Sequence, residues 1–285
     1  MNDQEKYLFD LQGFITVPDA LTKHQLAMLN QIWDEHIARD MAAEAHTQRW
    51  GGLLKWGQVY VDMLDNPTLM PYLEEILGKN FRLDHDYADL IRPNPTPGEA
   101  AVGPIGNTLH GGATPFDPSE YYHFHNGHMY NGLTVVAYNL CDIGADDGGF
   151  GCVPGSHKSN YAFPREWRDL NQAQPFVRKM TGPAGTAIIF TEALTHGTLP
   201  WFGRGERRTL FFKYSPYPVS WSANYYQAKD YVGLTETQQA LLEAPNARYQ
   251  GRQRMGQRIN EWATNGQRMG QRINEWATNK RINEL

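Results

Sequence analysis

The sequence predicts a mainly β fold, a sandwich or jelly roll with a few helices packed against it. Two observations support this prediction. Short runs rich in β-branched and aromatic residues, separated by Gly, Pro and Asp, recur between residues 81 and 216. Helical patterns that begin with capping residues lie before and after these runs. Regularly punctuated strands of this length are typical of closed or two-layered β folds, so we expect one β core with flanking helices.

The first eighty residues supply most of the expected helices. Segment 13–21, GFITVPDAL, reads as a short strand. Thr22 and Gln25 then form a capping-box pattern, which predicts a helix to about residue 45. A second helix is expected over 66–78, between an Asn-Pro start and a Gly stop.

The expected core strands follow. They are FRLDHDYADLI at 81–91, LTVVAYNL at 133–140, TAIIFTEAL at 186–194 and RTLFFKYSP at 208–216. A last helix is expected to begin at Thr235, with Gln238 as its capping-box partner, and to run to about residue 244.

The C-terminal segment is repetitive. Residues 253–265 recur without change as 267–279, and the letters RINE return at 281–284. The period of 14 residues is two heptads, which is compatible with an amphipathic helix that joins copies of the chain. A duplicated or artefactual segment without chemistry is the favoured reading. We therefore expect one domain over 1–250 and a separate tail over 251–285.

Composition limits the partners. The chain has 285 residues and a net charge of −5, and it has neither an apolar run near the ~20 residues of a membrane helix nor a basic and apolar leader. Its two cysteines cannot form a disulfide framework. We expect a cytoplasmic protein that acts on a small molecule, with no membrane or nucleic-acid partner and with self-association left open.

Two of the ten histidines stand where a metal site could form. His110 precedes the central strands, and His196 follows segment 186–194. Two histidines and a carboxylate hold non-haem Fe(II) and leave positions open for a co-substrate. Arg207, eleven residues after His196, begins an apolar strand and could grip a carboxylate, while its neighbour Arg208 should face the other way because side chains alternate along a strand.

Three longer segments carry a family resemblance. Residues 133–160, 184–198 and 206–216 are similar to the phytanoyl-CoA dioxygenase family of Fe(II)/2-oxoglutarate oxygenases, within a wider similarity over 13–221. The resemblance implies a cupin-like double-stranded β-helix, or jelly roll. It also implies iron held by an HxD motif and a distal His, and 2-oxoglutarate held by an Arg.

The resemblance assigns roles to single residues. His196 matches the distal ligand, Arg207 the arginine that binds 2-oxoglutarate, and Thr198 a hydroxyl that often helps to bind the same carboxylate. His110 matches the first ligand. His157, in the family turn GGFGCVPGSHK, is expected to be structural.

The chain departs from the family pattern after the first ligand. The motif reads His110-Gly111-Gly112, with glycine at the carboxylate position, and this HxG pattern resembles that of the Fe(II)/2-oxoglutarate halogenases. Chloride would occupy the space at Gly112. The favoured expectation is a halogenase that uses Fe(II), 2-oxoglutarate, O2 and chloride to chlorinate an unactivated C–H of a small freestanding metabolite, giving succinate and CO2.

Two other readings stay open. A carboxylate from elsewhere could complete the site of a hydroxylase: Asp117 and Glu120 follow in the loop, and Glu192 lies four residues before His196 and could share its strand face. A binding protein without catalysis is also conceivable, although the retention of His110 and His196 together with an arginine argues against it.

The segment 115–132 is rich in Tyr, His and Asn, which suits a lid over a polar substrate. The lid candidates are Tyr122, His123, His125 and His128. If the substrate is a nucleotide, the candidate phosphate contacts are Lys158, Arg204 and Arg208.

Overall fold

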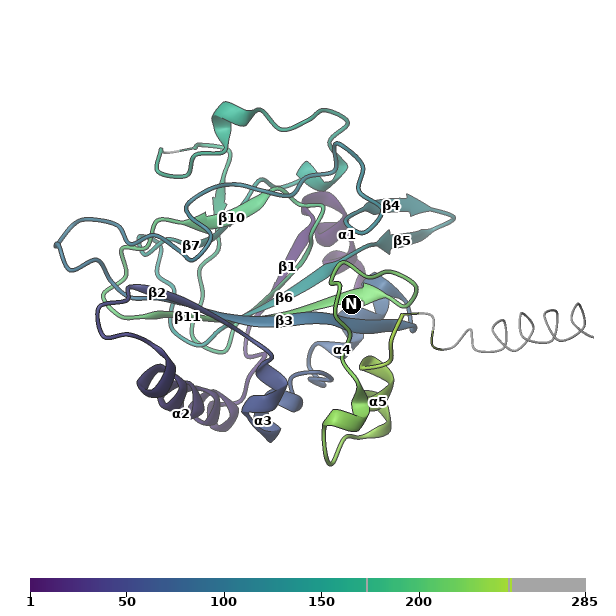
Figure 1. Cartoon of the computed structure of the whole chain (residues 1–285). Coiled ribbons are helices and arrows are strands. Elements are labelled where there is room, and N and C mark those ends of the chain that lie inside the picture. Colours follow the sequence, from purple (N-terminus) through teal and green to yellow (C-terminus); the bar gives the residue numbers. More distant parts are fainter. Residues whose placement is uncertain (173, 246, 248–285) are drawn as a thin grey trace, which may run out of the picture. The chain divides into compact units, whose positions relative to one another are not determined.

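The computed structural model describes residues 1–172, 174–245 and 247, and residues 1–245 form one compact unit (Figure 1). Most of its strands belong to two antiparallel sheets. The larger sheet has the order β1 (Phe14–Val17), β9 (Ala187–Thr191), β6 (Thr134–Asn139), β11 (Arg207–Pro216), β3 (Phe81–Ile91) and β2 (Thr47–Gly51). The smaller sheet has the order β10 (His196–Leu199), β7 (Gly149–Cys152) and β8 (Arg178–Lys179), and β4 (Tyr122–His125) pairs with β5 (His128–Asn131) as a separate hairpin.

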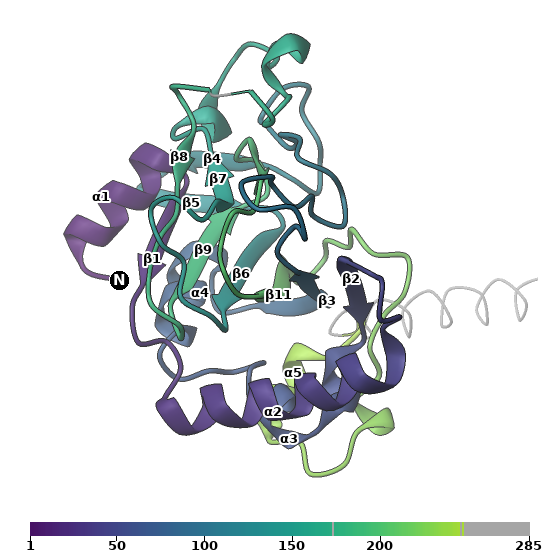
Figure 2. The same ribbon diagram turned by 90° about the vertical axis from the view of Figure 1, so that its left-hand side faces the viewer.

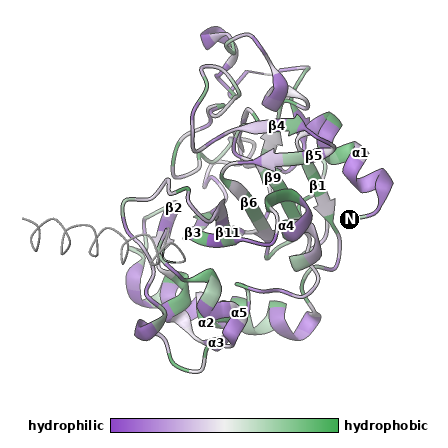
Figure 3. Cartoon of the chain, turned by 90° about the vertical axis from the view of Figure 1, so that its right-hand side faces the viewer, coloured by the Kyte–Doolittle hydropathy of each residue, from purple (hydrophilic) through white to green (hydrophobic). Residues whose placement is uncertain are grey.

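The two sheets pack face to face around one core. Phe150 and Cys152 of the smaller sheet share a buried cluster with Val135, Phe190 and other residues of the larger sheet. Strands β6 and β9 are buried along their whole length and are strongly hydrophobic in Figure 3, as expected for central strands covered on both faces. The prediction of a mainly β protein with flanking helices is therefore confirmed.

Helices cover the other face of the larger sheet, where α2 and α3 lie below the strands in Figure 2. The α-helices are α1 (Asp3–Gln12), α2 (Lys23–Asp40), α3 (Gln58–Val61), α4 (Met70–Leu77) and α5 (Glu236–Leu241). Short 3-10 helices span Leu53–Trp56, Ser156–Lys158, Arg165–Trp167 and Ala228–Asp230. None of the helices in the described ranges has the length and apolar character required to span a bilayer.

The expected helix starts are confirmed in two cases. Thr22 and Thr235 each cap a helix through a capping box with the glutamine three residues later. The same arrangement of Asn2 and Glu5 opens α1, a helix that was not among those expected. Its signal was present in the sequence, because Asn and Glu three residues apart are a capping-box pair.

Some expected boundaries were wrong. Helix α2 ends at Asp40 rather than near residue 45, and α4 begins at Met70 rather than at residue 66. The side chain of Asn66 instead accepts a hydrogen bond from the Thr68 N–H, which forms a turn before the helix. Strand β9 ends at Thr191, so the last residues of the expected strand 186–194 form a turn. The expected repetitive tail, 251–285, lies outside the described residues.

Alternation along β11 separates the two faces of the larger sheet. Leu210, Phe212 and Tyr214 belong to the cluster beneath the helices, whereas Phe211 belongs to the cluster between the sheets. Arg207 and Lys213 share the parity of Phe211 and therefore face the space between the sheets. This parity brings two cations to the side of the molecule where the candidate site lies.

The helix-side core depends on a group of tryptophans. Trp33 of α2 is fully buried, and its ring meets Trp50 and Trp56 edge-on at centroid distances of 6.0 and 6.2 Å. We expect Trp33→Ala to lower the free energy of unfolding by about 3–5 kcal/mol, since it leaves a large cavity. Urea denaturation measures this change. The exposed ring of Tyr7 supplies the control: Tyr7→Ala should shift stability by no more than about 0.5 kcal/mol, and an equally small loss for Trp33→Ala would contradict the packing argument.

Candidate metal centre

The two predicted imidazole ligands lie side by side. His110 and His196 form an isolated antiparallel bridge: the His110 N–H donates to the His196 carbonyl at 2.8 Å, and the His196 N–H donates back at 2.9 Å. Their ring centroids are 4.2 Å apart. Residues directly opposite each other in such a pair project to the same face, so the backbone itself brings both rings together.

A carboxylate completes the group. Ligand atoms of His110, Glu192 and His196 all lie within 4.8 Å of one another, and Glu192 Oε1 is 3.6 Å from His196 Nε2. Glu192 is the first residue after β9, and its N–H donates to the Leu133 carbonyl at 2.9 Å. The turn that follows β9 therefore delivers Glu192 and His196 to the same point. Two imidazoles and one carboxylate are the donor set of a non-haem Fe(II) site.

Neighbouring carbonyl groups orient the imidazoles. His196 Nδ1 lies 2.6 Å from the Leu194 carbonyl oxygen, which can only accept, so Nδ1 carries the proton and Nε2 keeps its lone pair. His110 Nδ1 lies 3.5 Å from the Thr108 carbonyl oxygen. Backbone carbonyls of this kind commonly fix metal-binding imidazoles.

The charges of the group are those that a cation requires. Burial opposes ionisation of Glu192, but Lys213 and the two imidazoles outweigh burial and lower the pKa of Glu192 to about 2. Burial, with His110 nearby, lowers the pKa of His196 to about 3. At neutral pH the carboxylate is ionised and His196 is neutral, the states in which both bind metals.

Lys213 holds the other oxygen of this carboxylate. Its Nζ lies 3.0 Å from Glu192 Oε2, and both side chains are buried. The carboxylate is thus divided: Oε2 meets the ammonium, and Oε1 faces His196. Glu192 is left with one oxygen directed at the candidate metal position.

The other two carboxylates that the sequence offered are placed differently. Asp117 is exposed and accepts hydrogen bonds from the N–H and hydroxyl of Ser119, which closes its own turn. Glu120 is half-buried, and burial together with the charge of Glu192 raises its pKa to about 7. Of the three, Glu192 is the one that lies with the imidazoles.

The glycines after His110 have backbone reasons to be glycine. Gly111 has φ +72°, and a Cβ there would lie 2.7 and 2.8 Å from the carbonyl oxygens of Leu194 and Glu192. Gly112 has φ +117°, and a Cβ there would lie 3.1 Å from Thr195 Oγ1. An aspartate at position 112 would therefore be strained, because L-residues rarely adopt this conformation.

Arg207 is a buried cation, and some of its hydrogen-bond donors are unpaired within the described residues. It is 1% exposed, and its Nε and Nη1 have no hydrogen-bond partner among the described residues. The side chain reaches Gly149 of β7, where a Cβ would lie 3.3 Å from Nε. Thr198, also nearly buried, lies on the adjacent strand β10. Because an unpaired buried guanidinium is costly, this environment fits a bound carboxylate such as one end of 2-oxoglutarate.

The expected opposite orientation of the two arginines is found. Arg208 lies on the helix side, where its Nη2 is 2.7 Å from Asp34 and 2.7 Å from Glu206. Lys158 pairs with Asp10 at 3.2 Å, and Arg204 is exposed in the turn before β11. Two of the three candidate phosphate contacts are thus already paired with carboxylates, and a shared phosphate site stays a prediction.

The lid candidates form the β4–β5 hairpin, which projects from the body of the molecule (Figure 1). His123 and His125 are exposed and stack on Tyr121 and Tyr130, and His128 is exposed as well. Tyr122 is buried and donates to Asp10. No member of the hairpin belongs to the three-residue cluster of the described chain, so its role as a lid stays a prediction.

His157 lies apart from this cluster. It is fully buried, its Nε2 is 3.0 Å from the Asp10 carbonyl oxygen, and burial lowers its pKa to about 4. These contacts agree with the structural role expected for it.

Solved structures share the fold. HygX from Streptomyces hygroscopicus with nickel and 2-oxoglutarate bound has a TM-score of 0.69 and 22% identity, over 82% of this chain and 95% of that chain. HygX with nickel, 2-oxoglutarate and hygromycin B bound has a TM-score of 0.67 and 22% identity over the same shares. The non-heme alpha-ketoglutarate-dependent epimerase SnoN from nogalamycin biosynthesis has a TM-score of 0.56 and 15% identity, over 76% and 83%. The jelly-roll prediction is thereby confirmed.

The family comparison agrees with the site. No curated protein matches the sequence. The family model for phytanoyl-CoA dioxygenase matches residues 9–209, which include both imidazoles, Glu192 and Arg207. Since this match covers well over half of the chain, the protein belongs to the phytanoyl-CoA dioxygenase family of Fe(II)/2-oxoglutarate-dependent oxygenases.

Proposed function

We propose that this protein is a hydroxylase-type Fe(II)/2-oxoglutarate oxygenase in which His110, Glu192 and His196 bind the iron. The observation that carries the proposal is the carboxylate of Glu192 within 4.8 Å of two imidazoles. The sequence motif lacks its own carboxylate, and the turn after β9 supplies one. The expected substrate is a small molecule with an unactivated C–H bond.

The residues present fit the cofactors. Bound Fe(II) and 2-oxoglutarate would together activate O2 to oxidise a C–H bond, with succinate and CO2 as the other products. Arg207 would bind the far carboxylate of 2-oxoglutarate through its unpartnered Nε and Nη1, with the Thr198 hydroxyl as a second contact. Leu194 fixes the His196 tautomer, and Lys213 holds Glu192 in its ionised form.

Halogenation is the second candidate, and Gly112 is the observation in its favour. Glycine stands where the motif carboxylate is expected, and halide would take that ligand's place. The need for a replacement anion is weaker than the motif suggests, because Glu192 already supplies a negative oxygen. We therefore place hydroxylation first.

The role of Glu192 can be tested by metal binding. Glu192→Gln keeps the shape of the side chain and removes its charge. We expect the affinity for Fe(II), measured by anaerobic calorimetry, to fall by at least roughly 10- to 100-fold. A loss of this size is typical even when the residue removed only hydrogen-bonds to a metal ligand. Glu120→Gln is the matched control and should leave the affinity within about twofold. A reversed pattern, with Glu120 the sensitive residue, would refute the proposed ligand set.

Halide dependence separates the two candidate reactions. If Glu192 is the carboxylate ligand, wild-type 2-oxoglutarate decarboxylation, followed as succinate release, should not depend on chloride. In Glu192→Ala the vacated position should accept an anion, so added chloride should restore part of the lost rate. A wild-type rate that requires chloride, or a brominated product in bromide buffer, would instead establish the halogenase.

Arg207 and Arg208 form a natural pair for testing cofactor binding. Arg207→Met removes a charged donor whose hydrogen bond to a carboxylate would contribute about 1.5–3 kcal/mol. The Kd for 2-oxoglutarate should therefore rise at least about tenfold. Arg208→Met removes the same charge from the opposite face of β11 and should leave that Kd nearly unchanged. Calorimetry with 2-oxoglutarate on the Mn2+-loaded protein gives both values. Equal effects of the two substitutions would count against the assignment.

A further inference from the structure

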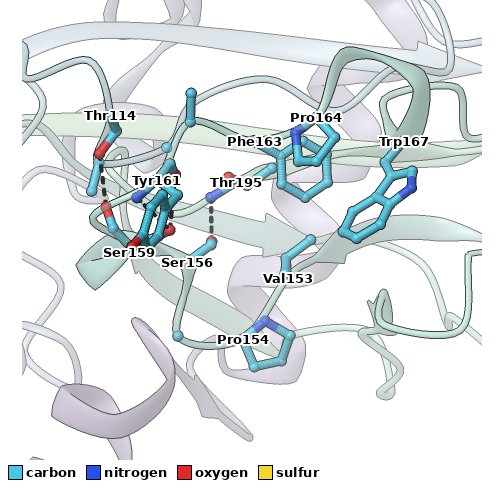
Figure 4. A pocket seen from close by; sticks show the side chains of 14 residues that line it. Thr114, Val153, Pro154, Ser156, Ser159, Tyr161, Phe163, Pro164, Trp167 and Thr195 are labelled. Carbon is cyan, nitrogen blue, oxygen red and sulfur yellow. Dashed lines mark hydrogen bonds between the residues drawn. The ribbon is translucent and has the colours of Figure 1, made fainter.

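A cavity of about 450 Å³ lies against the backbone segments that carry His110 and His196, and its lining includes neither imidazole nor Glu192. It lies between the loop 153–167 and the segment 112–114, and Thr195 forms part of its wall (Figure 4). Gly112 is two residues after His110, and Thr195 directly precedes His196. The cavity therefore touches both backbone segments that carry the imidazoles, and its volume is within the range of small-molecule sites.

The lining of this cavity is mostly apolar and carries no charged side chain. Phe163 and Trp167 stand on one side and Tyr161 on the other (Figure 4). Phe163 packs edge-on to Trp167 with a centroid distance of 6.0 Å, and Trp167 packs on Phe176 at 4.8 Å. These two rings pack on each other, although Trp167 is still 45% exposed, and Tyr161 is 85% exposed at the rim.

Three of the five hydroxyl side chains in the lining, those of Thr114, Ser156 and Ser159, hydrogen-bond within the protein. Thr114 Oγ1 donates to the Ser159 carbonyl at 2.7 Å, and Ser156 Oγ accepts from the Thr195 N–H at 2.7 Å (Figure 4). A ligand here would meet ring faces, Val153, two prolines and the hydroxyls of Tyr161 and Thr195, but no charged side chain. Burial of apolar surface would be its main source of affinity, at roughly 25 cal/mol per Å².

We propose that this cavity binds an uncharged, ring-bearing part of the substrate beside the metal centre. The inference rests on the proposed function, because a C–H bond must reach the metal while the rest of the molecule is held. Gly112, which lacks a side chain, forms the wall between the ring and the His110 segment. A phosphate would find no cation in this lining, so the predicted contacts at Lys158, Arg204 and Arg208 would concern another part of a substrate.

Fluorescence of the neutral probe N-phenyl-1-naphthylamine tests the cavity in metal-free protein. We expect saturable binding by the wild type, and a Kd about tenfold higher in Trp167→Ala, which removes the largest ring of the lining. Ala162→Leu should also weaken binding, because it fills the cavity without removing a ring. Tyr7→Ala, which removes an exposed ring on α1, should have no effect. A Kd for the probe that is unchanged in both Trp167→Ala and Ala162→Leu would overturn the assignment.

Proximity to the metal is tested with the same probe by NMR. Mn2+ bound at His110, Glu192 and His196 should broaden the proton signals of the bound probe, whereas Zn2+ should not, and Glu192→Gln should reduce the broadening at equal Mn2+. Sharp signals from a bound probe in the Mn2+-loaded wild type would show that the cavity is separate from the centre and would overturn the proposal. Failure of the wild type to bind Mn2+ at all would refute the proposed function, and with it the assignment of this cavity to a substrate.

Discussion

The contact between Lys213 and Glu192 is the interaction on which the candidate site depends. A carboxylate with almost no solvent exposure is strongly disfavoured in its charged form, and the ammonium group 3.0 Å away reverses that preference. The ammonium also takes Oε2 and leaves Oε1 toward His196. Tyr87 and Trp221 flank the ammonium at 5.5 and 6.0 Å from their ring centroids, which supports the cation where water is scarce.

Sequence alone was sufficient for the fold class and for the positions of several residues of the candidate site. The strands at 81–91 and 133–140 carry clear β patterns, and the separation of Arg207 from Arg208 follows from the two-residue period of a strand. His110 and His196 were predicted to meet, and the main-chain bridge between them is the reason that they do. Each of these features follows from the local sequence or from a family motif, so it can be predicted without knowledge of the tertiary packing.

The role of Glu192 was harder to predict, since it depends on where a strand ends. If the strand continued through 186–194, the extended backbone would hold Glu192 and His196 apart along the strand axis. The strand instead stops at Thr191, and the turn that follows returns the chain to pair with His110. The spacing of four residues between Glu192 and His196 indicated a shared face, but Asp117 and Glu120 also lie near the motif in the sequence. The turn after β9 and the contact of Lys213 with Glu192 distinguish Glu192 from the other two.

Gly112 takes on a different meaning once this turn is seen. In the motif, Gly112 stands where a ligand carboxylate is expected, and this absence suggests that an anion replaces the carboxylate. In the structure its φ of +117° disfavours any side chain, its Cβ position faces Thr195, and the position lines a cavity of apolar groups. A carboxylate there would place a charge in an uncharged lining at a backbone angle that aspartate rarely adopts. If Glu192 is the carboxylate ligand, as proposed, position 112 is free to form part of the cavity wall, and its glycine is explained by that wall as well as by halide.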